Sequence, residues 1–274
     1  MAFSDLTLHD YWINHPWLVG VAINTALIAI AFAIPKKLLT PSGYANAWLL
    51  GVIVWGALGW RGYVTTLFYF VVGSAVTKVG SAQKEAEGTA EARGGVRGPG
   101  NVWGSALTGA VCALAMVVIK AVAASSGNAV GDGLLPERSD LWLSLLALGF
   151  VASLSTKLSD TTATEIGKAY GQRTFLITTL QPVPRGTEGA VSLEGTLAGA
   201  IASVALAAIA WSIGLISLIG IAICAVAAFG ATTVESIIGA TIEEKLMWLT
   251  HDLVNIVNTT IGAVLAIGMG WFVL

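Results

Sequence analysis

The spacing of the charged residues is the feature that most constrains how this chain can fold. Short charged segments are separated by uncharged, mostly apolar stretches, and a helix needs about 20 such residues to cross about 30 Å of hydrocarbon. The stretch 195–234 is long enough for two helices and is expected to divide between Trp211 and Gly214. The seven stretches cover 11–35, 38–60, 62–77, 98–119, 141–156, 195–234 and 253–274. They predict about eight membrane-crossing helices.

The composition supports the same conclusion and excludes other classes. Apolar residues make up 55% of the chain and charged residues 11%, whereas soluble domains carry about 25% charged residues. The fold class is therefore expected to be all-α, a polytopic transmembrane helix bundle in which residues 1–274 form one integral membrane domain. Cys112 and Cys224 lie inside apolar runs, which supports neither a disulfide nor a zinc site. A net charge of -2 offers no surface for nucleic acid. Whether the chain forms a homo-oligomer stays open.

The basic residues predict the orientation. If Lys36 and Lys37 lie in the cytoplasm, eight crossings place eleven Lys and Arg residues inside and only three outside, as the positive-inside rule requires. Three charged segments then share the cytoplasmic side: 78–100, 157–194 and 231–250. No basic signal-peptide start precedes the first apolar stretch, so we expect the first helix to be retained. The stretches 62–77 and 141–156 are short for a bilayer. Either Lys78 and Lys157 snorkel, or these helices line a polar cavity.

The segment 78–100 has the features of a phosphate-binding turn. Arg93 and Arg97 flank a glycine-rich turn that leads into a helix N-terminus. Free backbone N–H groups, a positive dipole end and bidentate donors together suit a phosphate group. A plain flexible connector is the alternative interpretation. The further candidate ligand-binding residues of this segment are Lys78, Lys84, Gly94, Gly95 and Asn101.

The segment 157–194 begins with carboxylates at the depth of the membrane. Asp160, Thr164 and Glu165 follow directly on a predicted helix, and Lys168 stands next to Gly167. Such groups are costly in a membrane without partners, and Mg²⁺ prefers oxygen ligands, so a magnesium ion would account for them. The alternative is a set of ordinary polar residues at a helix end, paired with Lys157 and Lys168.

The same segment ends in a stretch rich in Thr, Pro and Gly that is typical of an anion-binding loop. Hydroxyl groups and backbone N–H groups are dense there, just before the next predicted helix. A buried re-entrant hairpin would have a similar composition. The candidate binding residues are Thr178, Thr179, Gly186, Thr187, Ser192 and Glu194.

The third segment, 231–250, supplies one further carboxylate that is expected to be buried. Glu235 lies four residues before Gly239, on the same helical face, and has apolar neighbours, which makes it a candidate metal ligand. In the last apolar stretch Asp252, Asn255 and Thr259 form a polar stripe at helical spacing. Such a stripe faces a cavity or forms an interhelical hydrogen-bonding seam. Together, the three segments predict one site at the cytoplasmic interface for a phosphorylated ligand, a divalent metal and a membrane-soluble partner.

Several motifs resemble a known family of membrane proteins. They extend from Leu39 to about Ala263 and comprise LTPSG, TKVG, GxAExRGGxRGxxNV, DTTATEIGK, LITT, PVPRGTEGAVSLEGT, ESIIGAT and VNxT. They resemble the family whose characterised plant and cyanobacterial members are phytyl-phosphate kinases of tocopherol synthesis. A remoter kinship with phytol and dolichol kinases is indicated by the spacing of Asp160, Ala163, Gly167, Lys168 and Gly171.

The resemblance implies transfer of a phosphoryl group from a nucleoside triphosphate to phytyl or another isoprenyl monophosphate. Kinship with the polyprenol kinases favours CTP as the donor. The implied ligands of Mg²⁺ are Asp160, Glu165 and Glu235. Positive charge at the phosphates would come from Arg93, Arg97 and Lys168. The implied location is a cyanobacterial-type plasma or thylakoid membrane, with the site facing the cytoplasm. A CTP-dependent nucleotidyltransferase that makes a CDP-lipid and a transporter of a phosphorylated metabolite are the alternatives.

Overall fold

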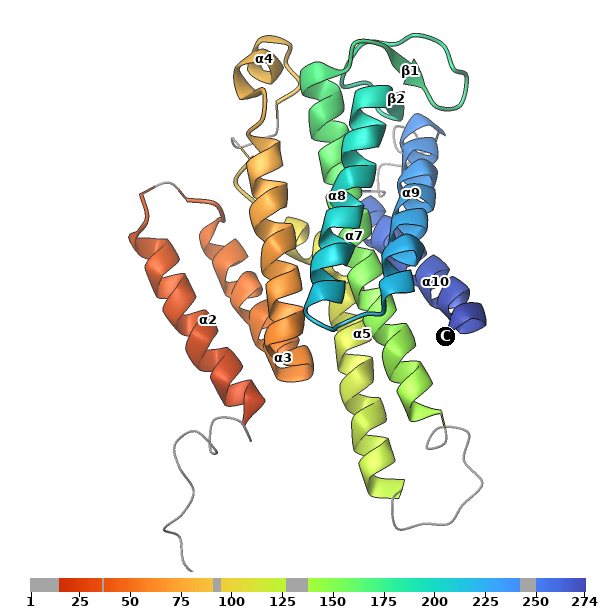
Figure 1. Ribbon diagram of the computed structural model, residues 1–274. Helices are drawn as coiled ribbons and strands as arrows, with labels where there is room; N and C mark the ends of the chain where they lie inside the picture. Colours follow the sequence, from red (N-terminus) through yellow and green to blue (C-terminus); the bar gives the residue numbers. More distant parts are fainter. Residues whose placement is uncertain (1–14, 36, 91–94, 127–137, 242–249) are drawn as a thin grey trace, which may run out of the picture.

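A computed structural model of the protein describes residues 15–35, 37–90, 95–126, 138–241 and 250–274. Long helices form most of the molecule and lie side by side in a bundle (Figure 1). The helices are α2 (Pro16–Ala33), α3 (Pro41–Thr77), α4 (Ser81–Ala86), α5 (Pro99–Ser126), α7 (Ser139–Tyr170), α8 (Leu193–Ser212), α9 (Leu218–Thr241) and α10 (His251–Val273). Two short antiparallel strands, β1 (Thr174–Leu176) and β2 (Ala190–Ser192), are the only strands in the described ranges. The predicted all-α class is confirmed.

Seven of the described helices are long and apolar enough to cross a membrane, and one of them is double. Helix α3 consists of two helices joined at Gly59, whose φ of 64° and ψ of -156° are accessible to glycine almost alone. The second arm returns beside the first (Figure 1), because Asn24 lies against Gly51 of one arm and accepts a hydrogen bond from Tyr63 Oη of the other at 2.8 Å. With the two arms of α3 counted separately, the described helices supply the eight predicted crossings.

Two boundaries test how well the charge spacing predicts the helices. The stretch 195–234 divides as expected, since α8 ends at Ser212 and α9 begins at Leu218, with Gly214 at a φ of 72° in the turn. The predicted short helix 141–156 is wrong, because α7 continues for 32 residues as far as Tyr170. Lys157 and Asp160 pair with each other inside the bundle, so their charges do not end the helix.

Helix α7 is the centre of the bundle. It packs against α3, α5, α8, α9 and α10, and 72% of its membrane-spanning window is buried, compared with 11% for the peripheral α2. Helix α8 approaches α7 closely through Gly195 and Gly199. A Cβ added at either glycine would lie 2.5 Å from Ala163 O or 2.7 Å from Ser159 O. Small residues four positions apart allow such close helix packing in membranes. The approach places the beginning of α8 beside Asp160.

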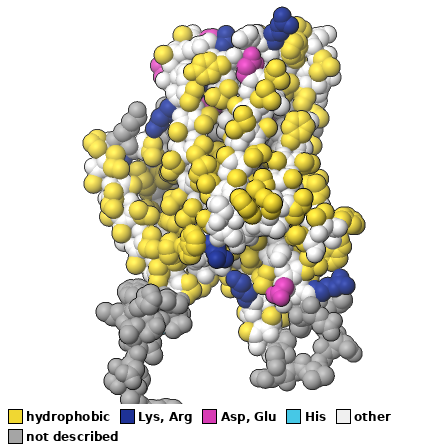
Figure 2. All heavy atoms as spheres, viewed as in Figure 1, with side chains coloured by type: hydrophobic (Ala, Val, Ile, Leu, Met, Phe, Trp, Pro, Cys, Tyr) yellow, Lys and Arg dark blue, Asp and Glu magenta, His cyan; other side chains and the backbone are white. Residues whose placement is uncertain are grey.

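Charged side chains gather at the two ends of the bundle, and hydrophobic side chains cover the surface between them (Figure 2). We call the end formed by α4, the β1–β2 hairpin and the C-terminal end of α7 the charge-rich end. At the opposite end, Arg61 donates to Gly214 O at 3.4 Å, beside the turn between α8 and α9. Exposed residues such as Val71 and Phe229 form part of the apolar surface between the ends. This distribution fits a bilayer-spanning bundle. That the charge-rich end faces the cytoplasm stays a prediction.

Candidate active site

A polar cavity of about 150 Å³ opens at the charge-rich end, among α7, α8, α9 and the segment that leads into β2. It brings together residues that lie far apart in the sequence. Its predicted members are Asp160, Thr164, Glu165, Gly167, Lys168, Gly186, Thr187, Ser192 and Glu235. Its further members include Lys157, Thr161, Thr196, Thr232, Ser236, Gly239 and His251. The cavity therefore joins the second and third predicted segments.

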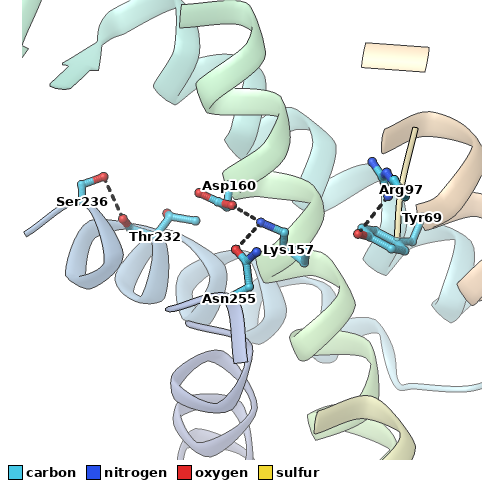
Figure 3. Close-up of polar contacts among 7 residues, drawn as sticks. All are labelled: Tyr69, Arg97, Lys157, Asp160, Thr232, Ser236 and Asn255. Carbon is cyan, nitrogen blue, oxygen red and sulfur yellow. Dashed lines mark hydrogen bonds and ion pairs between the residues drawn. The ribbon is translucent and has the colours of Figure 1, made fainter. Parts of the chain in front are cut away.

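An ion pair buried in the bundle lies at one wall of this cavity (Figure 3). Lys157 Nζ donates to Asp160 Oδ2 at 2.5 Å and to Asn255 Oδ1 at 2.6 Å. The side chains of Lys157 and Asp160 are each only 9% exposed. Burying two charges costs several kcal/mol per ion, which mutual attraction and further hydrogen bonds must offset. The polar stripe of α10 thus supplies a third partner, Asn255, to the pair on α7.

Helix α9 contributes a second carboxylate with hydroxyl groups around it. Glu235 lines the cavity between Thr232 and Ser236, and it is close enough to Lys157 to interact with it electrostatically. Ser236 Oγ donates to the carbonyl of Thr232 at 3.0 Å (Figure 3). Two carboxylates, Asp160 and Glu235, therefore flank one buried cation, Lys157, from two helices.

The opposite wall is built from backbone and a helix N-terminus. Ser192 caps α8 by accepting a hydrogen bond from Gly195 N at 3.1 Å, and Gly195 and Thr196 line the cavity. The positive end of the α8 dipole is therefore at the cavity, an arrangement that favours anions. Gly189 has a φ of 74° and lies directly against Ser236 O, so that any side chain at this position would collide with α9.

Lys168 is the cation at this cavity that is best placed to meet a ligand. It lines the cavity near the last turn of α7 and is half-buried. Within the described residues, no carboxylate forms an ion pair with it, whereas Lys157 is paired with Asp160. The interpretation that both lysines pair with helix-end carboxylates therefore holds for Lys157 and fails for Lys168.

The described part of the first charged segment, 78–100, does not line the polar cavity but contacts Glu165, which does. Lys84, only 1% exposed, forms an ion pair with Glu165 and donates to Thr77 O at 2.7 Å. At the surface Arg185 pairs with Glu87 at 3.5 Å. The Lys84–Glu165 pair fixes α4 against α7, and the Arg185–Glu87 pair links the turn at 184–186 to the end of α4. They also give Glu165 a cationic partner of its own.

Arg97 lies on the other side of α7, in a second and apolar cavity. This cavity, of about 210 Å³, is bounded by α2, both arms of α3 and the beginning of α5. Arg97 Nη1 donates to Tyr69 Oη at 3.3 Å (Figure 3), and Asn101 also lines the cavity while its Oδ1 accepts from Gly98 N at 3.0 Å. The predicted phosphate-binding turn and the polar cavity are therefore separate places in the fold.

Other predicted site residues lie outside both cavity linings. Lys78 is exposed at the end of α3, and Thr178 and Thr179 are exposed at the tip of the β1–β2 hairpin. Glu194 accepts a hydrogen bond from Gln172 N at 3.4 Å. Gly95, at a φ of 77°, lies against Thr77. Arg93 and Gly94 lie outside the described residues. The roles given to these seven residues stay predictions.

The polar cavity has a donor set that suits Mg²⁺ bound together with a phosphate ligand. Across the described ranges no three carboxylate, His or Cys groups are close enough to hold an ion by themselves. Mg²⁺, however, is usually held by one or two carboxylates plus substrate phosphates and water. Asp160 and Glu235, with the hydroxyls of Thr161 and Thr232, satisfy that description. Glu165 fits it less well, because its side chain is only 3% exposed, compared with 9% for Asp160.

Lys157 and His251 line the cavity but are not among the predicted site residues. The sequence leaves open whether Lys157 snorkels, lines a polar cavity or pairs with a carboxylate at the helix end, and its i, i+3 spacing to Asp160 is the signal that favours the pair. His251 lines the polar cavity from the first position of α10. No local motif distinguishes His251, and only the packing of α10 brings it there.

The fold and the site together define a polytopic membrane protein with a buried, ion-paired polar cavity at its charge-rich end. The chain belongs to the family described as integral membrane protein DUF92, whose model matches residues 24–263. This match covers the same part of the chain as the motifs, and it confirms the family resemblance.

Three relatives show how widely the family occurs. An uncharacterized membrane protein, sll0875, of Synechocystis is 60% identical over 96% of this chain and 95% of its own length. Protein VTE6, chloroplastic, of Arabidopsis thaliana is 44% identical over 94% of this chain and 73% of its own length. The uncharacterized membrane protein MJ0933 of Methanocaldococcus jannaschii is 24% identical over 91% of this chain and 94% of its own length. No solved structure matches the chain.

Proposed function

We propose that this protein is an isoprenyl-phosphate kinase. It would transfer a phosphoryl group from a nucleoside triphosphate, with CTP as the expected donor, to phytyl or a related isoprenyl monophosphate, and release the lipid diphosphate. The observation that carries the proposal is the polar cavity, in which carboxylates, a lysine that forms no ion pair among the described residues and a helix N-terminus meet inside an apolar bundle. The motif resemblance and the 44% identity to VTE6 support the choice of substrate class.

The chemistry asks the protein mainly for positioning and charge neutralisation. Lys168 and the N-terminus of α8 would bind the phosphates of the donor nucleotide. The attacking group is a phosphate oxygen, largely ionised at neutral pH with a second pKa of about 6, so no strong general base is required. Asp160 and Glu235 would hold Mg²⁺, which when bound neutralises phosphate charge. Lys157 keeps the Asp160 carboxylate in place within the bundle.

The test uses purified full-length protein in detergent with labelled CTP, ATP or GTP, Mg²⁺ and phytyl or geranylgeranyl monophosphate. We expect a lipid diphosphate and a nucleoside diphosphate as products. Pyrophosphate release with a CDP-lipid would instead show the nucleotidyltransferase. Uptake of a phosphorylated metabolite into vesicles without any nucleotide turnover would show the transporter. Either result would overturn the kinase proposal.

A pair of variants on the same helix tests the site. Asp160→Asn should lower kcat by about a hundredfold or more, since removing one electrostatic contributor typically costs that much. Asp140→Asn is the matched control. Asp140 lies in the first turn of α7, exposed at the opposite end of the bundle, and should retain wild-type turnover. Full activity in Asp160→Asn would remove this residue from the site.

A further inference from the structure

The apolar cavity on the far side of α7 combines a hydrocarbon-like wall with the cation of Arg97 at one end. Among the described residues that line it, Arg97 is the only charged one, and most of the others are Leu, Ile, Ala, Phe and Tyr. Along α2 the lining runs from Asn24 to Ala31, which is about 10 Å of helix, and it continues to Ile34 just beyond the end of α2. The cavity is therefore elongated along the bundle, with Arg97 at the charge-rich end.

Arg97 is held in place at the charge-rich end of the apolar cavity. Its backbone N–H donates to Leu38 O at 3.0 Å, and its carbonyl accepts from Thr40 N at 3.0 Å. The guanidinium lies 5.9 Å from the ring centroids of both Tyr69 and Phe70. Nη2 lies close to Gly73, where a Cβ would be only 3.3 Å away. The position and orientation of this cation are therefore fixed by the packing around it.

The charge of Arg97 is balanced by no carboxylate within the described part of the chain, where the three ion pairs involve Lys84, Lys157 and Arg185. A guanidinium next to an apolar cavity, with donors to spare, is complementary to a phosphate group that carries a hydrocarbon chain. Phosphate oxygens would take the free donors, and the chain would replace water along the apolar wall.

The end of the cavity away from Arg97 is lined by polar side chains that form hydrogen bonds within the protein. Asn24 Oδ1 accepts from Tyr63 Oη at 2.8 Å, and Asn24 Nδ2 donates to Gly20 O at 2.8 Å. These groups are paired within the protein and do not require a polar ligand. The end opposite Arg97 therefore suits the tip of a hydrocarbon chain. Because the two ends of the cavity differ in this way, a ligand would bind with its phosphate at Arg97 and its chain toward Asn24.

The two cavities lie on opposite sides of α7 (Figure 3). A Cβ at Gly73 would lie 3.3 Å from Arg97 Nη2 and 3.8 Å from Leu158 Cδ1, so Arg97 lies beside α7. A phosphate held by Arg97 would therefore lie next to α7, across the helix from Asp160.

We propose that the apolar cavity among α2, α3 and α5 is a binding site for an isoprenyl monophosphate, in which Arg97 binds the phosphate and the cavity holds the chain. This inference rests on the proposed function for the identity of the lipid.

The test is photolabelling without nucleotide, so that its result does not depend on turnover. The probe is geranylgeranyl monophosphate with a diazirine near the end of its chain, added to the full-length protein in lipid nanodiscs. We expect labelled peptides from the cavity walls, such as those containing Leu50 and Leu67. Excess phytyl monophosphate should compete, whereas dioleoyl phosphatidic acid at the same excess should not. Labels confined to the outer surface, or equal competition by phosphatidic acid, would overturn the proposal.

Three variants sharpen the test. Ala47→Phe places a ring in the cavity and should lower labelling about tenfold, while Ala45→Phe, on an exposed position of the same arm, should not. Arg97→Gln should weaken binding of the monophosphate by about 10 to 100-fold, because a charge-assisted bond is lost. Labelling by the corresponding uncharged alcohol should not change. Equal labelling of all variants by the monophosphate would contradict the site.

Failure of this inference and failure of the proposed function give different results. Cavity labelling by a protein that transfers no phosphoryl group would keep the lipid site and overturn the kinase. Turnover by a protein that is labelled elsewhere would keep the kinase and overturn the lipid site.

Discussion

The two cavities on either side of α7 differ in almost every physical respect, although one helix separates them. The polar cavity contains a buried ion pair, hydroxyl groups and a helix N-terminus, whereas the apolar cavity has hydrocarbon walls and one arginine. The polar cavity is costly to build, because its charges must be paired within a bundle that lies in lipid. The comparison teaches that a charge buried in this bundle needs a partner, as Lys157 has in Asp160, whereas an apolar cavity can form from the packing of side chains alone.

The largest effect on stability is expected from removing one member of the buried Lys157–Asp160 pair, which distinguishes the polar cavity from the apolar one. Lys157→Met leaves the Asp160 carboxylate buried without its cation, which costs about 3–5 kcal/mol in comparable sites. We expect a large fall in melting temperature in detergent. Lys120→Met, on an exposed position of α5, is the control and should melt as the wild type does. The double variant Lys157→Met/Asp160→Leu should recover much of the stability without activity. Wild-type melting of the single variant would show that the pair contributes little.

A smaller effect is expected from replacing Lys168, which forms no ion pair among the described residues. Lys168→Gln should raise the KM for the nucleotide by about 10 to 100-fold, since a hydrogen bond to a charged group contributes about 1.5–3 kcal/mol. Melting should change little, because no carboxylate in the described ranges depends on this lysine. Arg173→Gln, at an exposed position of the same end, serves as the control in steady-state kinetics. A similar rise in KM for both variants would indicate a general effect of surface charge.

The smallest effect on stability is expected at the end of the apolar cavity that Asn24 and Tyr63 line. Tyr63→Phe removes the hydrogen bond to Asn24 and should lower stability by about 1 kcal/mol, measured as a shift of a few degrees in melting temperature. Tyr170→Phe, at an exposed position, is the matched control and should not shift. A loss as large as that of Lys157→Met would mean that the apolar cavity also depends on a critical polar group.

The sequence predicted the crossings well because the hydrocarbon core imposes one length on all of them. The division of 195–234 near Gly214 and the reversal just before Arg61 both follow from that length and from the turn residues. The sequence predicted the end of α7 wrongly, because a prediction from charge spacing assumes that every charged residue lies outside the membrane. Lys157 and Asp160 break this assumption by neutralising each other.

The candidate site was predictable in part. Asp160, Lys168 and Glu235 have unusual positions in the sequence, and the bundle brings them to one cavity. Arg97 has an equally clear pattern, but the pattern could not show on which side of α7 it lies. That depends on the bridge between Leu39 and Arg97, a tertiary contact between two segments without regular repeats. Partners such as Asn255 and His251 also depend on how α10 packs.

The reversal of α3 at Gly59 has a consequence for how the protein is made. Because the two arms join directly at Gly59 without a loop, the first arm cannot insert into the bilayer while the second arm is still in water. The two arms must enter together as a hairpin. If insertion starts from the charge-rich side, as the positive-inside rule indicates, the hairpin carries Arg61 across the membrane, at a cost of about 2.5–3.5 kcal/mol. Biogenesis would therefore depend on the apolar residues of both arms entering in a single step.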